Sequence, residues 1–194
     1  VDNFIAEKCF ESARSLFRNA THLLYDKKSI WKRFAFFDQQ HGTIDSFVDT
    51  MTAATNACPN AEVLWLIYAK HVWNVEGGEK ALLILQQALV VNSTSEEIVL
   101  AQCKVLVALQ NFTAAKELLE TSKEILSDCP KVWMKLITLE RNMGNNNSSL
   151  ALLDKAINLY PEYYKFYLIK SQLLSDIPIE SLATLELGTR KCPN

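Results

Sequence analysis

The sequence is poor in glycine and proline, the two residues that most often interrupt helices. It has five of each among 194 residues, while hydrophobic residues make up 49% and charged residues 22%. This composition is typical of a globular chain and leaves long stretches free for helix, so a disordered chain is excluded. The length allows one large domain or two small ones.

The sequence also lacks a long apolar run and a strong excess of either charge. A membrane-spanning helix needs about 18–20 consecutive apolar residues, and no such run is present. The formal net charge of −2 provides no bulk attraction to nucleic acid or to an acidic membrane. We therefore expect no membrane contact and weak or no direct RNA binding.

Cysteine and histidine do not occur at the spacings that a disulfide framework or a metal site requires. The five cysteines are odd in number and include no C-x-x-C pair, which argues against a disulfide framework and a zinc site and favours reduced thiols. Three of them, Cys58, Cys129 and Cys192, precede prolines, and we interpret them as loop-packing residues.

The remaining candidates for chemistry also favour structural roles. The three histidines have no partner at ligand spacing; they are His22, His41 and His71. The carboxylates are interpreted as solvated faces and helix caps, and the Gly77-Gly78 pair is too short for a phosphate loop. The sequence therefore predicts no catalytic residues, no metal, no cofactor and no enzymatic activity.

What the sequence does contain is an internal repeat with a step of 34. Large apolar residues recur at this step, and we call them the anchors: Trp31, Trp65, Val99, Trp133 and Tyr167. The position four residues after each anchor is mostly small, as in Ala35 and Ala69, and so is the position at twenty-three. The position at twenty is large. The last repeat fits the positions at sixteen, twenty and twenty-three when its turn is two residues shorter. This shift selects Ser181, Leu185 and Gly188 for those three positions.

The breaks in the pattern agree with the repeat. Gly42, Gly77, Gly78 and Gly144 lie midway through repeats, where the first helix is expected to end in a left-handed cap. Prolines such as Pro59 and Pro161 lie between repeats, where the second helix must stop. Each repeat is thus two antiparallel helices of about 12–15 residues, and stacking on neighbouring repeats supplies the core.

We therefore expect an all-α fold, a right-handed superhelical solenoid of antiparallel helix pairs. Residues 1–194 are predicted to form a single repeat domain, cut from a longer protein. Its repeats are predicted at residues 1–26 (partial), 27–60, 61–94, 95–128, 129–162 and 163–194.

The column pattern resembles the tetratricopeptide (TPR) repeat. The acidic residues seven after two anchors, Asp38 and Glu140, make it more similar to the related HAT (half-a-TPR) repeat, although three repeats have Val72, Leu106 and Leu174 there. Several segments, in their order and spacing, resemble the C-terminal HAT array of the pre-mRNA processing factor 6 family. They are KKSIWKRFAFFDQQHGT, CPNAEVLWLIYAKHVW, NSTSEEIVLAQCKV, CPKVWMKLITLERNMGN and YPEYYKFYLIKSQLL.

The resemblance implies a nuclear, non-enzymatic protein–protein interaction scaffold in pre-mRNA splicing, which helps to assemble or bridge the spliceosomal tri-snRNP. Its partners would be other spliceosomal proteins. Two alternatives stay open: a TPR adaptor that binds a peptide segment, and a helical subunit of another RNA-processing complex. The adaptor would need a clamp of Lys and Arg on the concave rows.

The candidate partner-binding surface is the concave face of the first helices. Its residues lie one and five positions after the anchors: Lys32, Phe36, Leu66, Lys70, Lys104, Met134 and Leu168. Either this row seats a partner helix or extended segment, or it packs against the adjacent repeat, which is favoured for Leu100. The only basic cluster consists of Lys27, Lys28, Lys32 and Arg33. It is either an ordinary helix start or a contact to an acidic partner or RNA.

Overall fold

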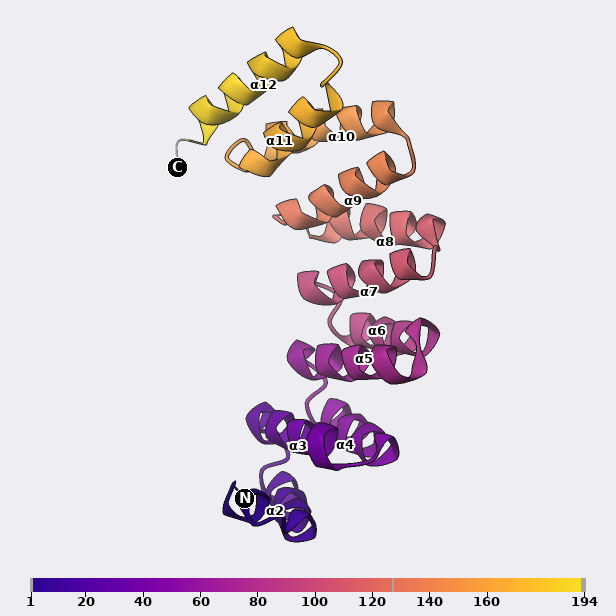
Figure 1. Cartoon of the computed structure of the whole chain (residues 1–194), viewed down its shortest axis with the longest axis vertical. Coiled ribbons are helices and arrows are strands. Elements are labelled where there is room, and N and C mark those ends of the chain that lie inside the picture. Colours follow the sequence, from indigo (N-terminus) through magenta and orange to yellow (C-terminus); the bar gives the residue numbers. More distant parts are fainter. Residues whose placement is uncertain (1, 127, 193–194) are drawn as a thin grey trace. The chain divides into compact units, whose positions relative to one another are not determined.

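The computed structural model describes residues 2–126 and 128–192, and all regular structure in those ranges is α-helical (Figure 1). The helices are α1 (Asp2–Ala6), α2 (Phe10–Leu23), α3 (Lys28–His41), α4 (Ile44–Ala57), α5 (Glu62–Glu76), α6 (Gly78–Val91), α7 (Glu96–Ala108), α8 (Phe112–Ile125), α9 (Pro130–Asn142), α10 (Asn146–Leu159), α11 (Tyr164–Leu173) and α12 (Pro178–Lys191).

The helices follow the period of the sequence. The first helices of the repeats begin at residues 28, 62, 96, 130 and 164, a constant step of 34. The second helices begin at residues 10, 44, 78, 112 and 146 with the same step, and α12 begins at residue 178, two residues early. The predicted repeat and the shorter last turn are therefore confirmed.

The chain divides into two compact units, Val1–Leu109 with α1–α7 and Gln110–Asn194 with α8–α12. Within the first unit, α3 packs on α4 and α5 on α6, and the first helices α3, α5 and α7 also contact in sequence. Within the second unit, α9 packs on α10 and α11 on α12. Turns of one to four residues join these pairs, so the paired helices run antiparallel.

The boundary between the units falls inside the repeat predicted at 95–128, because α7 belongs to the first unit and α8 to the second. A single domain over residues 1–194 and the right-handed superhelix stay predictions.

The core is built from the predicted columns. The five anchors are buried, with exposed fractions of 1–8%. In the first four repeats the residues four and twenty after the anchors are also buried, among them Ala35, Met51 and Leu153. In the last repeat the position at four is buried, but Leu185, which the shorter turn selects for the large column, is exposed. In the last repeat Gly188 is buried while Arg190 is exposed, as the shorter turn requires. A Cβ on Gly188 would lie 2.9 Å from Cβ of Tyr167, so this close approach of α12 to α11 needs glycine.

The mid-repeat turns correct one prediction. Gly77 and Gly144 have φ values of 100° and 80°, in the left-handed region as expected, but Gly42 has φ −98° and is extended. The prediction of a left-handed cap is therefore wrong at Gly42, and it is also wrong at Gly78, which is the first residue of α6. Space requires glycine at position 42, because a Cβ would lie 2.6 Å from the carbonyl oxygen of Asp38. The left-handed step is taken without glycine at Gln110, one repeat before Gly144.

The turns between repeats are held by the anchors. Nε1 of Trp31 donates to the carbonyl oxygen of Tyr25 at 2.6 Å, and Nε1 of Trp65 donates to that of Pro59 at 2.8 Å. The hydroxyl of the anchor Tyr167 likewise donates to the carbonyl oxygen of Pro161 at 2.8 Å. Each of these three anchors thus fills the core with its ring and satisfies a turn carbonyl six residues earlier with its polar atom.

The same carbonyl oxygens accept a second bond from the end of the next repeat. The Cys58 thiol contacts the carbonyl of Tyr25 at 3.6 Å, Asn92 Nδ2 donates to that of Pro59 at 3.0 Å, and the Cys192 thiol contacts that of Pro161 at 3.6 Å. Cys58 and Cys192 therefore lie in loop packing. Cys129 differs, because it precedes α9 and is buried.

Candidate interaction surface

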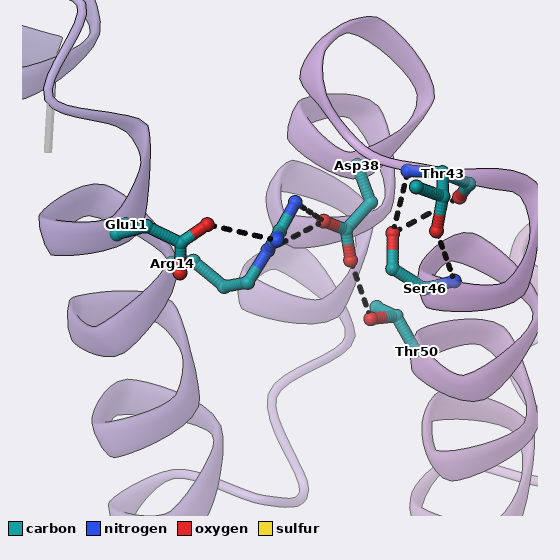
Figure 2. A network of polar contacts seen from close by, with 6 residues as sticks. All are labelled: Glu11, Arg14, Asp38, Thr43, Ser46 and Thr50. Atoms are coloured by element: carbon teal, nitrogen blue, oxygen red, sulfur yellow. Dashed lines mark hydrogen bonds and ion pairs between the residues drawn. The ribbon is translucent and has the colours of Figure 1, made fainter.

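The acidic residues seven positions after two of the anchors, Asp38 and Glu140, are buried in polar networks and do not lie on a solvated face. Asp38 on α3 is 2% exposed. Its Oδ1 lies 3.1 Å from Nη2 of Arg14 on α2, and its Oδ2 accepts a hydrogen bond of 2.6 Å from Oγ1 of Thr50 on α4 (Figure 2). Arg14 also contacts Glu11. Asp38 therefore joins three helices, one of them from the preceding repeat.

Glu140 occupies the same position in the second unit. It is 1% exposed, and its Oε1 lies 2.5 Å from Nζ of Lys116 on α8. Its Oε2 accepts a hydrogen bond of 2.9 Å from Asn145 Nδ2. Burial by itself raises the pKa of Glu140, but the hydrogen bonds from Lys116, Asn145 and Ser148 together with the positive charge of Lys116 outweigh it and hold the pKa below its ordinary value.

The partners of these two acids share a spacing that sequence reasoning missed. Arg14 and Asp38 lie 24 positions apart in the sequence, and Lys116 and Glu140 have the same spacing. Where the acid is replaced by an apolar residue, the position at this spacing before it is apolar too, in the pairs Val48/Val72, Leu82/Leu106 and Leu150/Leu174. The base and the acid thus occur together or not at all, which is expected because a buried charge without its partner is costly.

A groove in the first unit brings together three of the predicted surface residues. We call it the Lys70–Lys104 groove; it has a cavity volume of about 420 Å³ and lies between α5 and α7. Its floor is apolar and comes from three helices: Ala69, Leu85 and Val105 are all buried. Leu66 is half-buried in its wall. A volume and lining of this kind suit an apolar side chain.

The rim of the Lys70–Lys104 groove is basic and polar. Lys70 and Asn74 on α5 and Lys104 on α7 are exposed. Nζ of Lys104 lies 5.4 Å from the ring centroid of Trp73, a cation–π distance that holds the ammonium beside the groove. The sequence pattern missed Trp73 and Asn74. They lie eight and nine residues after the anchor Trp65, outside the rows one and five residues after the anchors.

A second groove lies along α3, the first helix of the repeat at residues 27–60. It has a volume of about 590 Å³ and contains Lys32 and Phe36 of α3 together with Arg33 and Ile67. Phe36 is 59% exposed, an unusual state for a phenylalanine. Two further predicted surface residues are thus close together, beside the one basic cluster of the sequence.

The predicted residues of the second unit behave differently from one another. Met134 on α9 is half-buried and packs against the cluster around Trp133 and Ile137, as the packing interpretation expects. Leu168 on α11 is 44% exposed. Leu100 of the first unit is half-buried. A binding role for the row stays a prediction.

His41, His71 and Cys58 lie in packing environments, whereas His22 and Cys9 are exposed. His41 stacks on Phe10 with ring centroids 4.3 Å apart, at the end of α3. His71 lies against Phe47 at 3.9 Å, and burial lowers its pKa despite the opposing charge of Glu76. Burial raises the pKa of the Cys58 thiol. No group of three or more His, Cys, Asp or Glu side chains arranged for a metal occurs among the described residues.

The family comparison agrees with these buried acids and packed columns. The family model of the PRP39 C-terminal HAT repeat matches residues 6–142, more than half of the sequence. The chain belongs to this HAT repeat family. The HAT assignment made from Asp38 and Glu140 is therefore confirmed, whereas pre-mRNA processing factor 6 as the particular relative stays a prediction. A search of curated protein sequences finds no significant match.

Solved structures similar to this HAT array are TPR and related solenoids. The structure of MamA has a TM-score of 0.60 at 16% identity, covering 84% of this chain and 91% of that one. TTC0263, a thermophilic TPR protein of Thermus thermophilus, has 0.56 at 18% identity, covering 89% and 94%. YrrB, described as a TPR protein with an unusual peptide-binding site, has 0.57 at 13% identity, covering 92% and 93%. At these identities the likeness confirms the fold alone.

These findings confirm an all-helical HAT/TPR-like solenoid, a fold that serves as a repeat scaffold for protein interaction. In the described part of the HAT array, no helix is both long enough and apolar enough to cross a bilayer.

Proposed function

We propose that this HAT array is a nuclear, non-enzymatic scaffold in pre-mRNA splicing, which helps to assemble or bridge the spliceosomal tri-snRNP through other spliceosomal proteins. The proposal is carried by the match of residues 6–142 to the family of the PRP39 C-terminal HAT repeat. Grooves along the first helices support it, because they offer separate docking surfaces whose modest contacts add through avidity.

Affinity purification from nuclear extract with the immobilised chain tests this function. We expect tri-snRNP proteins, identified by mass spectrometry, to be enriched over a blank matrix. A variant carrying Leu66→Glu, Met134→Glu and Leu168→Glu should lose most of this recovery if the predicted row is the docking surface. Its matched control changes three exposed apolar residues outside the row, Leu23, Val90 and Leu159, to glutamate.

Two results would count against parts of the proposal. If neither the wild-type chain nor the control recovers splicing proteins, the splicing role is wrong. If the row variant recovers them as well as the wild type does, only the row is rejected. Recovery of a different RNA-processing complex would favour the helical-subunit alternative, with any catalysis on another chain.

A second candidate function, a TPR-type adaptor that binds a peptide segment, is favoured by Lys70 and Lys104. The leucines one residue after the anchors provide no clamp of this kind, but the row five residues after the anchors carries these two lysines on one groove. An adaptor that grips a peptide C-terminus would distinguish a free carboxylate from an amide. Equal affinity for the two forms of one peptide would exclude it.

Direct RNA binding by this chain is proposed to be weak or absent. The Lys27, Lys28, Lys32 and Arg33 cluster is balanced by acidic residues elsewhere, and the formal net charge is −2. Titration with a labelled single-stranded RNA at physiological salt should give no saturable signal in the micromolar range. Tight binding that weakens steeply with salt would contradict this.

A further inference from the structure

We propose that the Lys70–Lys104 groove binds a short extended peptide segment in which acidic residues flank one bulky apolar side chain. The inference rests on the proposed scaffold function and names the chemistry of the partner at one site. It concerns the first unit alone, because the groove is formed by α5, α6 and α7.

The two rim lysines have no acidic partner in the part of the chain that the structure describes. Several lysines in the described residues contact a carboxylate, such as Lys80 with Glu76, Lys123 with Glu120 and Lys170 with Asp154. Lys70 and Lys104 have no carboxylate contact there, and both are exposed on the same groove from two different helices. Two unpaired ammonium groups at one site attract carboxylates and select against basic partners.

The floor of the Lys70–Lys104 groove is apolar and open to a partner side chain. Ala69 and Ala101 are small, so the groove stays open above the buried Leu85 and Val105. An apolar side chain of a partner would displace water from this surface, and such burial provides most of the affinity of a short peptide. The lysines at the rim would then fix its register through the flanking acidic residues.

The lining of the Lys70–Lys104 groove suits a peptide better than RNA. A groove that binds single-stranded RNA needs an aromatic face on which a base can stack. Trp73 is the aromatic residue of this groove, and the ammonium of Lys104 lies over its ring. The apolar floor is also of no use to a phosphate backbone. The observations therefore favour an acidic and apolar peptide.

The test is a selection of random dodecapeptides displayed on phage, with the full 194-residue chain as the immobilised target. We expect enriched peptides to carry Asp or Glu on both sides of a Phe, Leu, Ile or Trp. The most enriched sequence, synthesised with a fluorescent label, is then titrated by anisotropy. Lys70→Glu/Lys104→Glu should weaken binding at least tenfold, and raised salt should weaken binding to the wild type.

The matched control is Lys135→Glu/Lys155→Glu, which makes the same change of charge at exposed positions on α9 and α10 and should bind like the wild type. Circular dichroism of both variants shows that they are folded. As a second variant, Ala101→Phe fills the groove without a change of charge and should also weaken binding at least tenfold.

The inference is overturned if no peptide is enriched, if the enriched peptides lack acidic residues, or if the Lys70→Glu/Lys104→Glu variant binds them unchanged. A labelled single-stranded RNA that binds more tightly than the peptide and is lost in the same variant also overturns it. The scaffold proposal fails separately: nuclear-extract purification with the Lys70→Glu/Lys104→Glu variant can still recover splicing proteins after the peptide inference has failed.

Discussion

The two buried carboxylates, one in each unit, solve the same packing problem with different chemistry. Asp38 is short and is reached by Arg14 from the preceding repeat and by Thr50 from its own second helix. Glu140 is one methylene longer and reaches the turn residue Asn145, while Lys116 replaces the arginine. Position 152, equivalent to Thr50, is a leucine in that repeat.

The difference shows that a buried acid at this position needs a basic residue and a further hydrogen-bond donor, but that the residues supplying them can differ between repeats. Arg14 is well shielded, with 15% of its side chain exposed, whereas the Lys116 side chain is 41% exposed. Repeats without the acid have apolar residues at both positions of the pair. Salt bridge and apolar pair are thus two ways to fill the same space between repeats.

The largest effect is expected when one base is removed and its acid stays buried. Arg14→Leu should lower the free energy of unfolding by about 3 kcal/mol, because Asp38 is left without a counter-charge. Lys116→Leu should cost less, about 2 kcal/mol, because its ammonium is partly in water and Asn145 still donates to Glu140. Urea unfolding followed by circular dichroism measures both. Equal or reversed costs would contradict the comparison.

A smaller effect is expected from the hydroxyl that only the first network uses. Thr50→Val removes a hydrogen bond to a buried carboxylate at nearly constant volume and should cost about 1.5 kcal/mol. The control is Thr52→Val on the same helix, which removes only a solvent-exposed hydroxyl contact with Tyr68 and should change the unfolding free energy by less than about 0.5 kcal/mol. A Thr50→Val protein as stable as the control would remove Thr50 from the network.

A still smaller net change is expected when both members of a pair become leucine. Lys116→Leu/Glu140→Leu and Arg14→Leu/Asp38→Leu should each lie within about 1 kcal/mol of the wild type, because buried ion pairs are often replaced by apolar residues without loss. Leu82/Leu106 and Leu150/Leu174 are natural examples in this chain. Double-mutant cycles from the same urea curves give the coupling energy. Additive single and double changes would refute the pairing.

The last prediction concerns pH and distinguishes the pair in the second unit from its apolar replacement. The pKa of Glu140 is lower in the folded than in the unfolded chain, so its stabilising contribution is present above the unfolded pKa and is lost as pH falls through the folded pKa. As pH falls into the acid range, the wild type should therefore lose stability relative to Lys116→Leu/Glu140→Leu, which has no carboxylate at this position. A difference that is constant from neutral pH into the acid range would contradict this.

Much of the fold followed from single residues at fixed steps. The anchors, their buried small neighbours and even the two-residue shift that selects Gly188 were predicted from the sequence, because each buried column must recur once per helix pair. The left-handed cap at Gly42 was not predicted correctly, because glycine there serves the close approach of the Asp38 carbonyl rather than a special backbone angle.

The candidate surface was predicted less completely. The two rows placed Leu66, Lys70 and Lys104 on the first helices, and the structure brings these three into one groove. Trp73 and Asn74 were missed, because they lie one turn beyond the rows, and which residues share a groove depends on how far apart two helices lie. The basic partners of Asp38 and Glu140 were readable in the sequence as a constant spacing between two recurring columns.

The sequence by itself determined the period, the helical class and the identity of the buried columns, because these depend on local helix geometry and on which side chains avoid water. The tertiary structure alone decided which donors reach each buried carboxylate and which lysines remain unpaired at a groove. Those outcomes depend on distances of a few ångströms between helices from different repeats, and such distances are set by the packing of many side chains together.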